Sequence, residues 1–270
     1  REEIEEECPM SVAGLLIAYG LAGCIVLQLL LWVYQQRTSE ADIVDVGWTA
    51  SLGMLALWYA IGSQGDQLNR ILVALYAGAW SLRLGTYLLC SRVLVSGEDE
   101  RYAELRRSWG SKASRNFFIF FLAQAVLAVI LSLPFLVIAV SQERVSALSV
   151  LVSLTIAGGA ILGEASADAQ LRAFRAKPEN RGTTCRVGLW RYSRHPNYFF
   201  EWLYWLSFVA LGISLPFGFV TLIGPLVMYW FLIKITGIPA TEARALASRG
   251  ENYREYQRTT NMFFPWLPRT

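Results

Sequence analysis

The densest group of side chains that could do chemistry lies in residues 191–201, and it begins with Arg191, Arg194 and the only histidine of the chain, His195. Pro196 fits the first turn of a helix, so that helix would direct its free backbone N–H groups toward the basic residues just before it. A helix end of this kind binds anions. The pattern predicts a phosphate site, and the alternative is that the basic residues anchor the helix at anionic lipid headgroups.

Two polar residues at the start of the same predicted helix point to another part of a ligand. Asn197 and Glu201 are four residues apart and therefore share one helical face. A glutamate at the end of a membrane span is unusual, because that position favours Lys or Arg. The carboxylate needs a hydrogen-bond donor, so this pair is predicted to bind a carboxamide or an amine of a ligand.

A second polar stripe is expected on the helix that precedes this region. Its members recur at helical spacing and are acidic at the membrane end and basic further out: Glu164, Asp168, Arg172 and Arg175. A series of salt bridges along the helix, with Asp168 to Arg172 first, would also explain the pattern. The functional interpretation is a second wall of the same site, suited to an elongated ligand with an amide-bearing head and several phosphates.

A third group lies inside the apolar stretches, where ionisable side chains are costly and are functional candidates by default. Asp45 and Arg83 are the charged members, and a pair between them that holds two spans together is the alternative. Arg83, Tyr87 and Arg92 share a helical stripe that leads toward the membrane surface. Three aromatic residues lie nearby in sequence: Trp48, Tyr76 and Trp80.

The composition indicates what must position these groups. Of the 270 residues, 54% are hydrophobic and 17% are charged, whereas soluble domains carry about a quarter charged residues. The net charge of +3 is too small to indicate nucleic acid. One histidine and no HExxH motif leave a metal-dependent enzyme without ligands, so no metal is expected. There is no Rossmann or P-loop glycine motif and no GxSxG nucleophile motif.

Seven apolar stretches are close to the roughly 20 residues that a membrane span needs. The sequence therefore predicts an all-α, polytopic integral membrane protein, folded as a single domain over residues 1–270. Its predicted transmembrane helices are residues 11–34, 43–61, 71–90, 117–140, 145–163, 198–215 and 217–236. The first is preceded by acidic residues and is too long for a cleaved signal peptide.

Most of the 24 Lys and Arg fall in the connections 35–42, 91–116 and 164–197 and in the tail 234–270. Positive charge marks the cytoplasmic side, so the N-terminus is predicted outside and the C-terminus in the cytoplasm. The tail 237–270 should contain a helix over 241–258 that breaks near Gly250. This helix would either lie on the membrane surface or form a lid over the site.

The sequence resembles the membrane steroid 5-alpha-reductase family, in its bacterial branch, and the resemblance is clearest from Glu164 to the end. The motif residues that carry it are Gly188, Leu189, Trp190, Arg191, Tyr192, Arg194, His195, Pro196, Asn197, Tyr198, Glu201, Tyr253, Tyr256, Phe264 and Pro265. The resemblance implies a seven-span enzyme that binds NADPH at its cytoplasmic end and reduces the C=C bond of an enone, usually in a 3-oxo-4-ene steroid.

The same resemblance implies which residues bind the cofactor. Asn197 and Glu201 would lie near the nicotinamide carboxamide, and Glu164 stands where the family has Asn. Arg181 and Arg186 are candidates for the 2′-phosphate. The full set of implied cofactor-binding residues is Arg83, Tyr87, Arg92, Glu164, Asp168, Arg172, Arg175, Tyr192, Arg194, His195, Asn197, Tyr198, Glu201, Tyr253 and Tyr256.

The substrate end departs from the family, whose carbonyl-polarising pair is a Glu and a Tyr. Asp45 and Trp80 stand at the nearest positions, with Tyr76 as a third catalytic candidate. Trp donates a hydrogen bond but cannot deliver a proton, so the acid would be Asp45, Tyr76, Tyr87 or water. Hydride from the nicotinamide would reach the β carbon of the enone while Asp45 or a neighbour stabilises the developing enolate oxygen.

The expected partners are NADPH, a lipophilic enone or steroid-like substrate and the lipid bilayer, with no nucleic acid and no metal. The membrane would be the bacterial inner membrane or, in a eukaryote, the endoplasmic reticulum. Membrane methyltransferases that use S-adenosylmethionine share the RHPxY signature, so a methyltransferase is the alternative function. That ligand has no phosphates and would not need Arg172 and Arg175 on one stripe with Asp168. A non-enzymatic transporter or scaffold is the third possibility.

Overall fold

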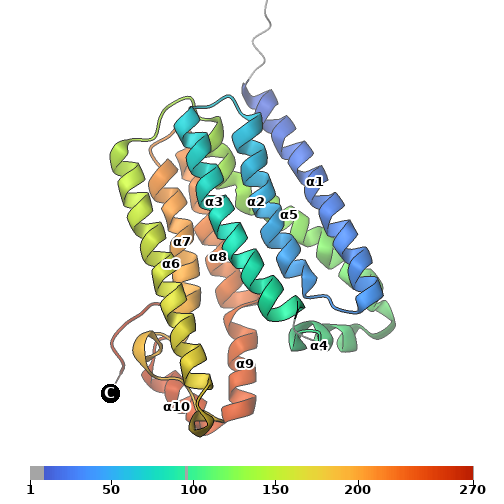
Figure 1. Cartoon of the computed structure of the whole chain (residues 1–270), viewed down its shortest axis with the longest axis vertical. Helices are drawn as coiled ribbons and strands as arrows, with labels where there is room; N and C mark the ends of the chain where they lie inside the picture. Colours follow the sequence, from blue (N-terminus) through green and yellow to red (C-terminus); the bar gives the residue numbers. More distant parts are fainter. Residues whose placement is uncertain (1–8, 95–96, 270) are drawn as a thin grey trace, which may run out of the picture. The chain divides into compact units, whose positions relative to one another are not determined.

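The computed structural model describes residues 9–94 and 97–269, and these residues contain helices and no strand (Figure 1). Contacts within the chain divide it into two compact units. Unit 1 is Arg1–Val145 with Gly212–Ile223, and unit 2 is Ser146–Leu211 with Gly224–Thr270. Each unit has its own helices and its own polar clusters, so each is described by itself.

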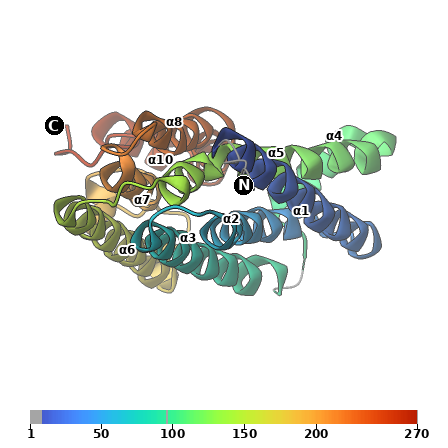
Figure 2. The same cartoon turned by 90° about the horizontal axis from the view of Figure 1, so that it is seen from above.

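Unit 1 is a bundle of long apolar helices with one short polar helix. Its elements are α1 (Pro9–Thr38), α2 (Ile43–Gly62), α3 (Gln67–Leu88), a π-helical turn (Leu89–Val93), α4 (Glu100–Trp109), α5 (Ala113–Val140) and a 3-10 turn (Gly218–Leu222). α2 packs against α1 and α3, and α5 packs against α1 and α2 (Figure 2). The aromatic side chains of Tyr102, Phe117 and Phe121 are buried where α4 and α5 meet the start of α2.

Small residues let α2 and α3 approach closely. A Cβ atom added to Gly53 would lie 2.8 Å from the Cβ of Ser81, which is closer than carbon atoms pack. The Ser81 hydroxyl donates a hydrogen bond to the backbone carbonyl of Thr49 at 2.7 Å. Close approach of this kind is typical of helices that associate in membranes through small side chains.

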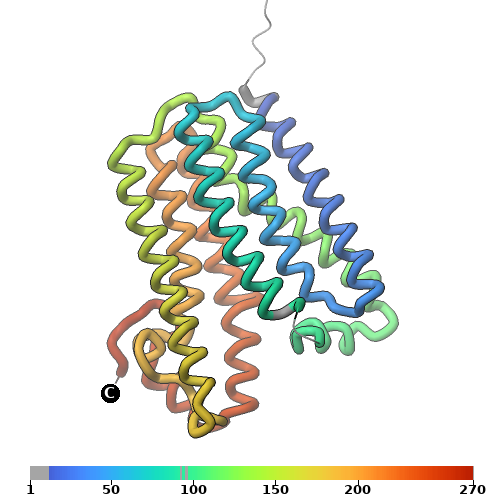
Figure 3. The backbone as a smooth tube through the Cα atoms, viewed as in Figure 1, coloured from blue at the N-terminus to red at the C-terminus, as the bar shows by residue number. Residues whose placement is uncertain are grey.

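Unit 2 contains the segment with the densest polar residues. Its elements are α6 (Ala147–Arg175), two 3-10 turns (Pro178–Asn180 and Gly188–Arg191), α7 (Pro196–Gly212), α8 (Ile223–Trp230), a π-helical turn (Phe231–Ile235), α9 (Ile238–Arg249) and α10 (Glu251–Thr259). The loop after α6 turns back along that helix (Figure 3). Trp190 fixes it there by donating its ring N–H to the carbonyl of Ala167 at 2.8 Å.

Within the described residues, six helical stretches are long and apolar enough to cross a membrane: Val12–Thr38, Ile43–Gly62, Gln67–Ser91, Glu100–Val140, Ala147–Arg175 and Gly218–Arg249. The prediction of a multi-pass membrane protein is confirmed at this level. α7, which matches the predicted span 198–215, has 17 residues, or about 26 Å of helix, and is not among the six. Seven spans and the orientation stay predictions.

The boundaries differ from the predicted ones mainly around the polar segments. α6 continues for three turns beyond residue 163, where the predicted span ends, as the helical spacing of Glu164, Asp168, Arg172 and Arg175 predicts. The predicted span 217–236 is not a single regular helix, since a 3-10 turn, α8 and a π-helical turn follow one another there. The predicted break at Gly250 is confirmed: its φ of 54° separates α9 from α10.

The close packing of α2 on α3 gives a stability prediction. Gly53→Ala should lower the free energy of unfolding by about 1 to 3 kcal/mol, because Ser81 cannot move away without shifting α3. Gly78→Ala is the matched control: a Cβ there meets nothing within 4 Å, and Ala is the better helix former. Thermal unfolding in detergent measures both variants. Equal melting temperatures for the two would contradict the packing described here.

Candidate functional site

Arg194 and His195 stand just before α7, and both face Glu242 of α9. Arg194 Nε donates to Glu242 Oε1 at 2.7 Å, and His195 Nε2 lies 3.3 Å from the same oxygen. The side chains are largely buried, with exposed fractions of 11% for Arg194, 3% for His195 and 15% for Glu242. This ion pair therefore joins the start of α7 to α9 away from solvent.

The C-terminal helix completes the set of partners. Gln257 Nε2 donates to Glu242 Oε2 at 2.8 Å, and the Tyr253 hydroxyl donates to Glu242 Oε1 at 3.3 Å. Arg194 Nη1 donates to the carbonyls of Gln257 and Thr260, each at 2.9 Å. We call Arg194, His195, Glu242, Tyr253 and Gln257 the Glu242 cluster. Both charged groups are satisfied from several sides, as buried ion pairs must be.

Tyr256 holds the loop before α7 in the same way. Its buried hydroxyl donates to the carbonyls of Trp190 and Ser193, and burial raises its pKa above the ordinary value. The Ser193 hydroxyl in turn donates to the carbonyl of Phe263 at 2.8 Å. Tyr253 and Tyr256 thus connect the C-terminal segment to the loop that carries Arg194.

These contacts add a structural role to residues that the sequence predicted as cofactor ligands. Arg194 donates to a carboxylate and to backbone carbonyls, and His195 lies between Glu242 and the ring of Tyr198, which stacks on it at 5.4 Å. The Tyr198 hydroxyl lies 3.3 Å from Thr241 Oγ1. A direct phosphate contact by Arg194 stays a prediction. In the structure, the contacts of the Glu242 cluster fix the position at which α7 begins.

The polar stripe of α6, predicted as the second wall of the site, contacts the first turn of α7. Asn197 Nδ2 donates to Asp168 Oδ1 at 3.2 Å, so the first turn of α7 is joined to α6. One helical turn away lie Glu201, which follows Asn197 on α7, and Glu164, which precedes Asp168 on α6, and both are 8% exposed. Trp205 Nε1 donates to Glu201 Oε1 at 3.3 Å. The structure brings together Asn197 and Asp168, as the two-wall hypothesis requires.

The basic end of α6 does not form the salt bridges that the alternative explanation of the stripe predicts. Arg172 and Arg175 are exposed, and neither forms an ion pair with a residue in 9–94 or 97–269. Arg175 lines a pocket with Arg181 and Arg249. Arg249 was not predicted, because its position in α9 gives no hint that it lies near the end of α6. Arg186, in contrast, pairs with Glu255 at 2.9 Å.

The predicted catalytic residues lie in unit 1. Asp45 is in the first turn of α2, and its Oδ1 accepts a hydrogen bond from the Tyr102 hydroxyl at 2.7 Å. Its Oδ2 accepts one from Arg101 Nη2 at 3.2 Å. The sequence did not single out Tyr102 or Arg101, because the polar pattern of residues 100–109 is that of any solvated short helix. A contact between Asp45 and α4 was therefore missed.

The other predicted residues of unit 1 lie along α3. Tyr76 and Trp80 are buried, and the ring of Trp80 meets that of Trp48 edge to face at 5.8 Å. Tyr87 is exposed, and Arg83 lies one turn before it. The side chain of Arg92 is outside the described part of the chain. Tyr192 is an exposed loop residue of unit 2, and its carbonyl accepts the backbone N–H of Trp266 at 3.0 Å.

Burial of His195 gives a pH prediction. Burial lowers its pKa below the ordinary 6.5, against the opposing pull of Glu242. As the pH drops below about 6.5, His195 takes up a proton in the unfolded chain but stays neutral in the folded chain. The free energy of unfolding should therefore fall as the pH drops below about 6.5. Thermal unfolding in detergent between about pH 5 and pH 8 measures this. His195→Gln should have a shallower dependence, and an unchanged dependence would contradict the assignment.

Among the described residues there is no group of three or more His, Cys, Asp and Glu side chains that could hold a metal ion. No curated protein and no solved structure matches the chain. One family model does, over residues 31–260, and it is described as a protein family of unknown function, DUF1295. The match covers most of both units, including Asp45, the Asn197–Asp168 pair and the Glu242 cluster. The chain therefore belongs to the DUF1295 family.

Proposed function

We propose that this protein is an NADPH-dependent membrane reductase that acts on the C=C bond of a lipophilic enone. The observation that carries the proposal is the join between α6 and α7. The Asn197–Asp168 pair stands at one end of the polar part of α6, and the exposed Arg172 and Arg175 stand at the other. Seven residues separate Asp168 from Arg175, which is about 10 Å along the helix. NADPH has this polarity, with a carboxamide at one end and phosphates beyond it.

The acidic and amide groups suit the nicotinamide end. A carboxamide offers two N–H donors and one carbonyl acceptor. Glu201 can only accept while it is ionised, and Asn197 can do both. Because both lie on the first turns of α7, the Glu242 cluster, which fixes the start of that helix, also fixes their positions. When bound, NADPH would supply the hydride, so the protein itself needs no nucleophile.

The reaction also needs a group that stabilises negative charge on the enone oxygen. Asp45 is the candidate that the sequence supplies, and the structure adds its two donors, Tyr102 at 2.7 Å and Arg101 at 3.2 Å. These two groups would offset the charge of the carboxylate and supply the donor and the positive charge that the enolate oxygen needs. A carboxyl and a phenol joined in this way are together the chemical equivalent of the Glu and Tyr of the steroid 5-alpha-reductases. In this pair Tyr102 replaces the hydroxyl that Trp80 cannot provide.

The topology belongs to the same proposal. Seven spans with the N-terminus outside would place the polar connections 91–116 and 164–197 and the tail in the cytoplasm, where NADPH is found. The lipophilic substrate would then come from the bilayer. The host membrane is the bacterial inner membrane or the endoplasmic reticulum.

The direct test is an activity assay of the full chain in lipid nanodiscs. A panel of lipophilic enones, including 3-oxo-4-ene steroids, is mixed with NADPH, and both cofactor oxidation and the saturated product are measured. The proposal expects stoichiometric product with at least one enone. Methyl transfer from S-adenosylmethionine to isoprenylated thiols or phospholipids, with no NADPH oxidation, would instead support the methyltransferase that shares the RHPxY signature.

Binding should depend on the two residues assigned to the carboxamide. Asn197→Ala and Glu201→Ala should each weaken NADPH affinity by about 1 to 3 kcal/mol, because each removes a hydrogen bond to the amide. Calorimetric titration in nanodiscs measures the loss. Ser166→Ala, at an exposed position of α6, is the control and should bind as the wild type does. If both variants kept wild-type affinity, Asn197 and Glu201 would be packing residues only.

Catalysis should depend on Asp45 without cofactor affinity changing. Asp45→Asn should lower kcat by roughly a hundredfold or more, because an amide cannot share a proton with Tyr102. NADPH affinity should stay at the wild-type value. Glu100→Gln, an exposed change on α4, is the matched control. A wild-type kcat in the Asp45 variant would remove that residue from the mechanism.

A further inference from the structure

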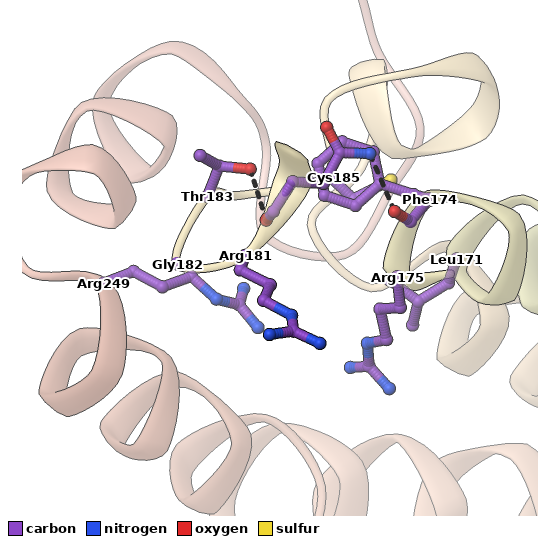
Figure 4. Close-up of a pocket in the computed structure, with 9 residues that line it drawn as sticks. Leu171, Phe174, Arg175, Arg181, Gly182, Thr183, Cys185 and Arg249 are labelled. Atoms are coloured by element: carbon purple, nitrogen blue, oxygen red, sulfur yellow. Dashed lines mark hydrogen bonds between the residues drawn. The ribbon is translucent and has the colours of Figure 1, made fainter. Parts of the chain in front are cut away.

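Unit 2 contains a small pocket at the end of α6. Its volume is about 200 Å³. The lining residues come from α6, from the loop after it and from the end of α9, and they include Arg175, Asn180, Arg181, Thr183, Cys185 and Arg249. Figure 4 shows the guanidinium groups of Arg175, Arg181 and Arg249 directed toward the same open space.

These three arginines differ from several other arginines of the unit, which pair with a carboxylate. Arg194 pairs with Glu242, and Arg186 pairs with Glu255. Arg175, Arg181 and Arg249 form no ion pair with any residue in the described ranges of unit 2, although they line one pocket. Three positive charges at one place repel one another. An anion in the pocket would remove that cost.

Cys185 lines the same pocket and lies close to two of these charges. Burial raises the pKa of its thiol, and the backbone of Val187 and the charges of Arg175 and Arg249 oppose that rise. The two guanidinium groups come from helices that are far apart in sequence, α6 and α9. Their convergence on one buried thiol means that the tertiary fold, and not a local run of basic residues, assembles the pocket.

The loop that contributes Arg181 is held in place by its own hydrogen bonds. Asn180 Nδ2 donates to the carbonyl of Phe174 at 2.7 Å, which ties the loop to the last turn of α6. Thr183 Oγ1 donates to the carbonyl of Asn180 at 2.7 Å. Gly182 takes a φ of 76°, which closes the turn between them. The backbone of Arg181 is therefore fixed before any ligand arrives, and this lowers the entropy cost of binding.

The number and type of donors select the ligand. Each guanidinium offers up to five N–H donors in a planar fork that matches the oxygen atoms of phosphate. A carboxylate has one charge and two oxygens, which a single arginine satisfies. A phosphate monoester carries close to two negative charges and three terminal oxygens, so it can engage three arginines together. We propose that the Arg175–Arg181–Arg249 pocket binds a terminal phosphate monoester.

Two sources can supply this group: the 2′-phosphate of NADPH or the phosphomonoester headgroup of a lipid such as phosphatidic acid. The first source rests on the proposed function, and the preference for a phosphate monoester does not. With NADPH as the source, the pocket distinguishes NADPH from NADH, which lacks this phosphate. Arg249 and Arg181 then become specificity-determining residues of the reductase.

The test uses the full chain in phosphatidylcholine nanodiscs and calorimetric titration. Wild-type protein should bind NADPH more tightly than NADH. Arg249→Gln should lose roughly tenfold or more of its NADPH affinity and none of its NADH affinity. Arg181→Gln repeats the test from the loop, in case the α9 variant unfolds. Arg254→Gln is the matched control, because Arg254 is exposed and pairs with Glu251 at 3.4 Å.

Two further probes separate this pocket from the proposed function. Adenosine 2′-monophosphate is titrated alone, and phosphatidic acid is added to the nanodiscs and compared with phosphatidylglycerol, a phosphodiester. Binding of either monoester that Arg249→Gln weakens supports the pocket even if NADPH does not bind, and it shows which source applies. The pocket proposal is overturned if no monoester binds, or if both arginine variants bind every monoester as the wild type does.

Discussion

The arrangement of α9, α10 and the loop before α7 in unit 2 depends on the ion pair between Arg194 and Glu242. Removing two opposite charges from water is costly, and the cost is recovered only when further hydrogen bonds satisfy both groups. Glu242 accepts from Gln257 and Tyr253 as well, and Arg194 also donates to two backbone carbonyls. The pair therefore requires α9, α10 and the loop before α7 to be in place together. It fixes the first turn of α7, where Asn197 reaches Asp168.

Unit 2 thus uses its arginines in two ways. Arg194 is enclosed and paired, and it positions other residues. Arg175, Arg181 and Arg249 have no carboxylate partner among the described residues and line a pocket. A protein that only needed basic residues at lipid headgroups would not fix them in a pocket through a tied loop. Because Arg194 is paired while these three arginines have no carboxylate partner in the described part of the chain, the three are available to bind phosphates. This supports a ligand with an amide head and phosphates, as the reductase proposal requires.

Local patterns in the sequence predicted the parts that depend on neighbouring residues. Long apolar stretches predicted the helices that are long and apolar enough to cross a membrane, except that α7 is not among them. Pro196 predicted the start of α7, and Gly250 predicted the break between α9 and α10. The two polar stripes predicted that Asn197 and Asp168 lie together, because helical spacing sets which side chains share a face, and the two side chains are hydrogen-bonded.

The parts that the sequence did not predict depend on partners far apart in the chain. Arg194 and Glu242 are separated by 48 residues, and Tyr102 and Asp45 by 57. Neither pair has a periodic signature, since an acidic residue on a surface helix looks the same whether or not it meets a buried arginine. For the same reason, the sequence alone did not show that Arg194 and His195, which suggested a phosphate site, are also members of the Glu242 cluster.

Calorimetric titration of the wild-type protein in nanodiscs with NADPH, NADH and S-adenosylmethionine, each alone, decides between the reductase and the methyltransferase. We expect saturable binding of NADPH, weaker binding of NADH and no binding of S-adenosylmethionine. Binding of S-adenosylmethionine without either nicotinamide cofactor would contradict the reductase proposal and would assign the polar end of α6 and α7 to a methyl-transfer site.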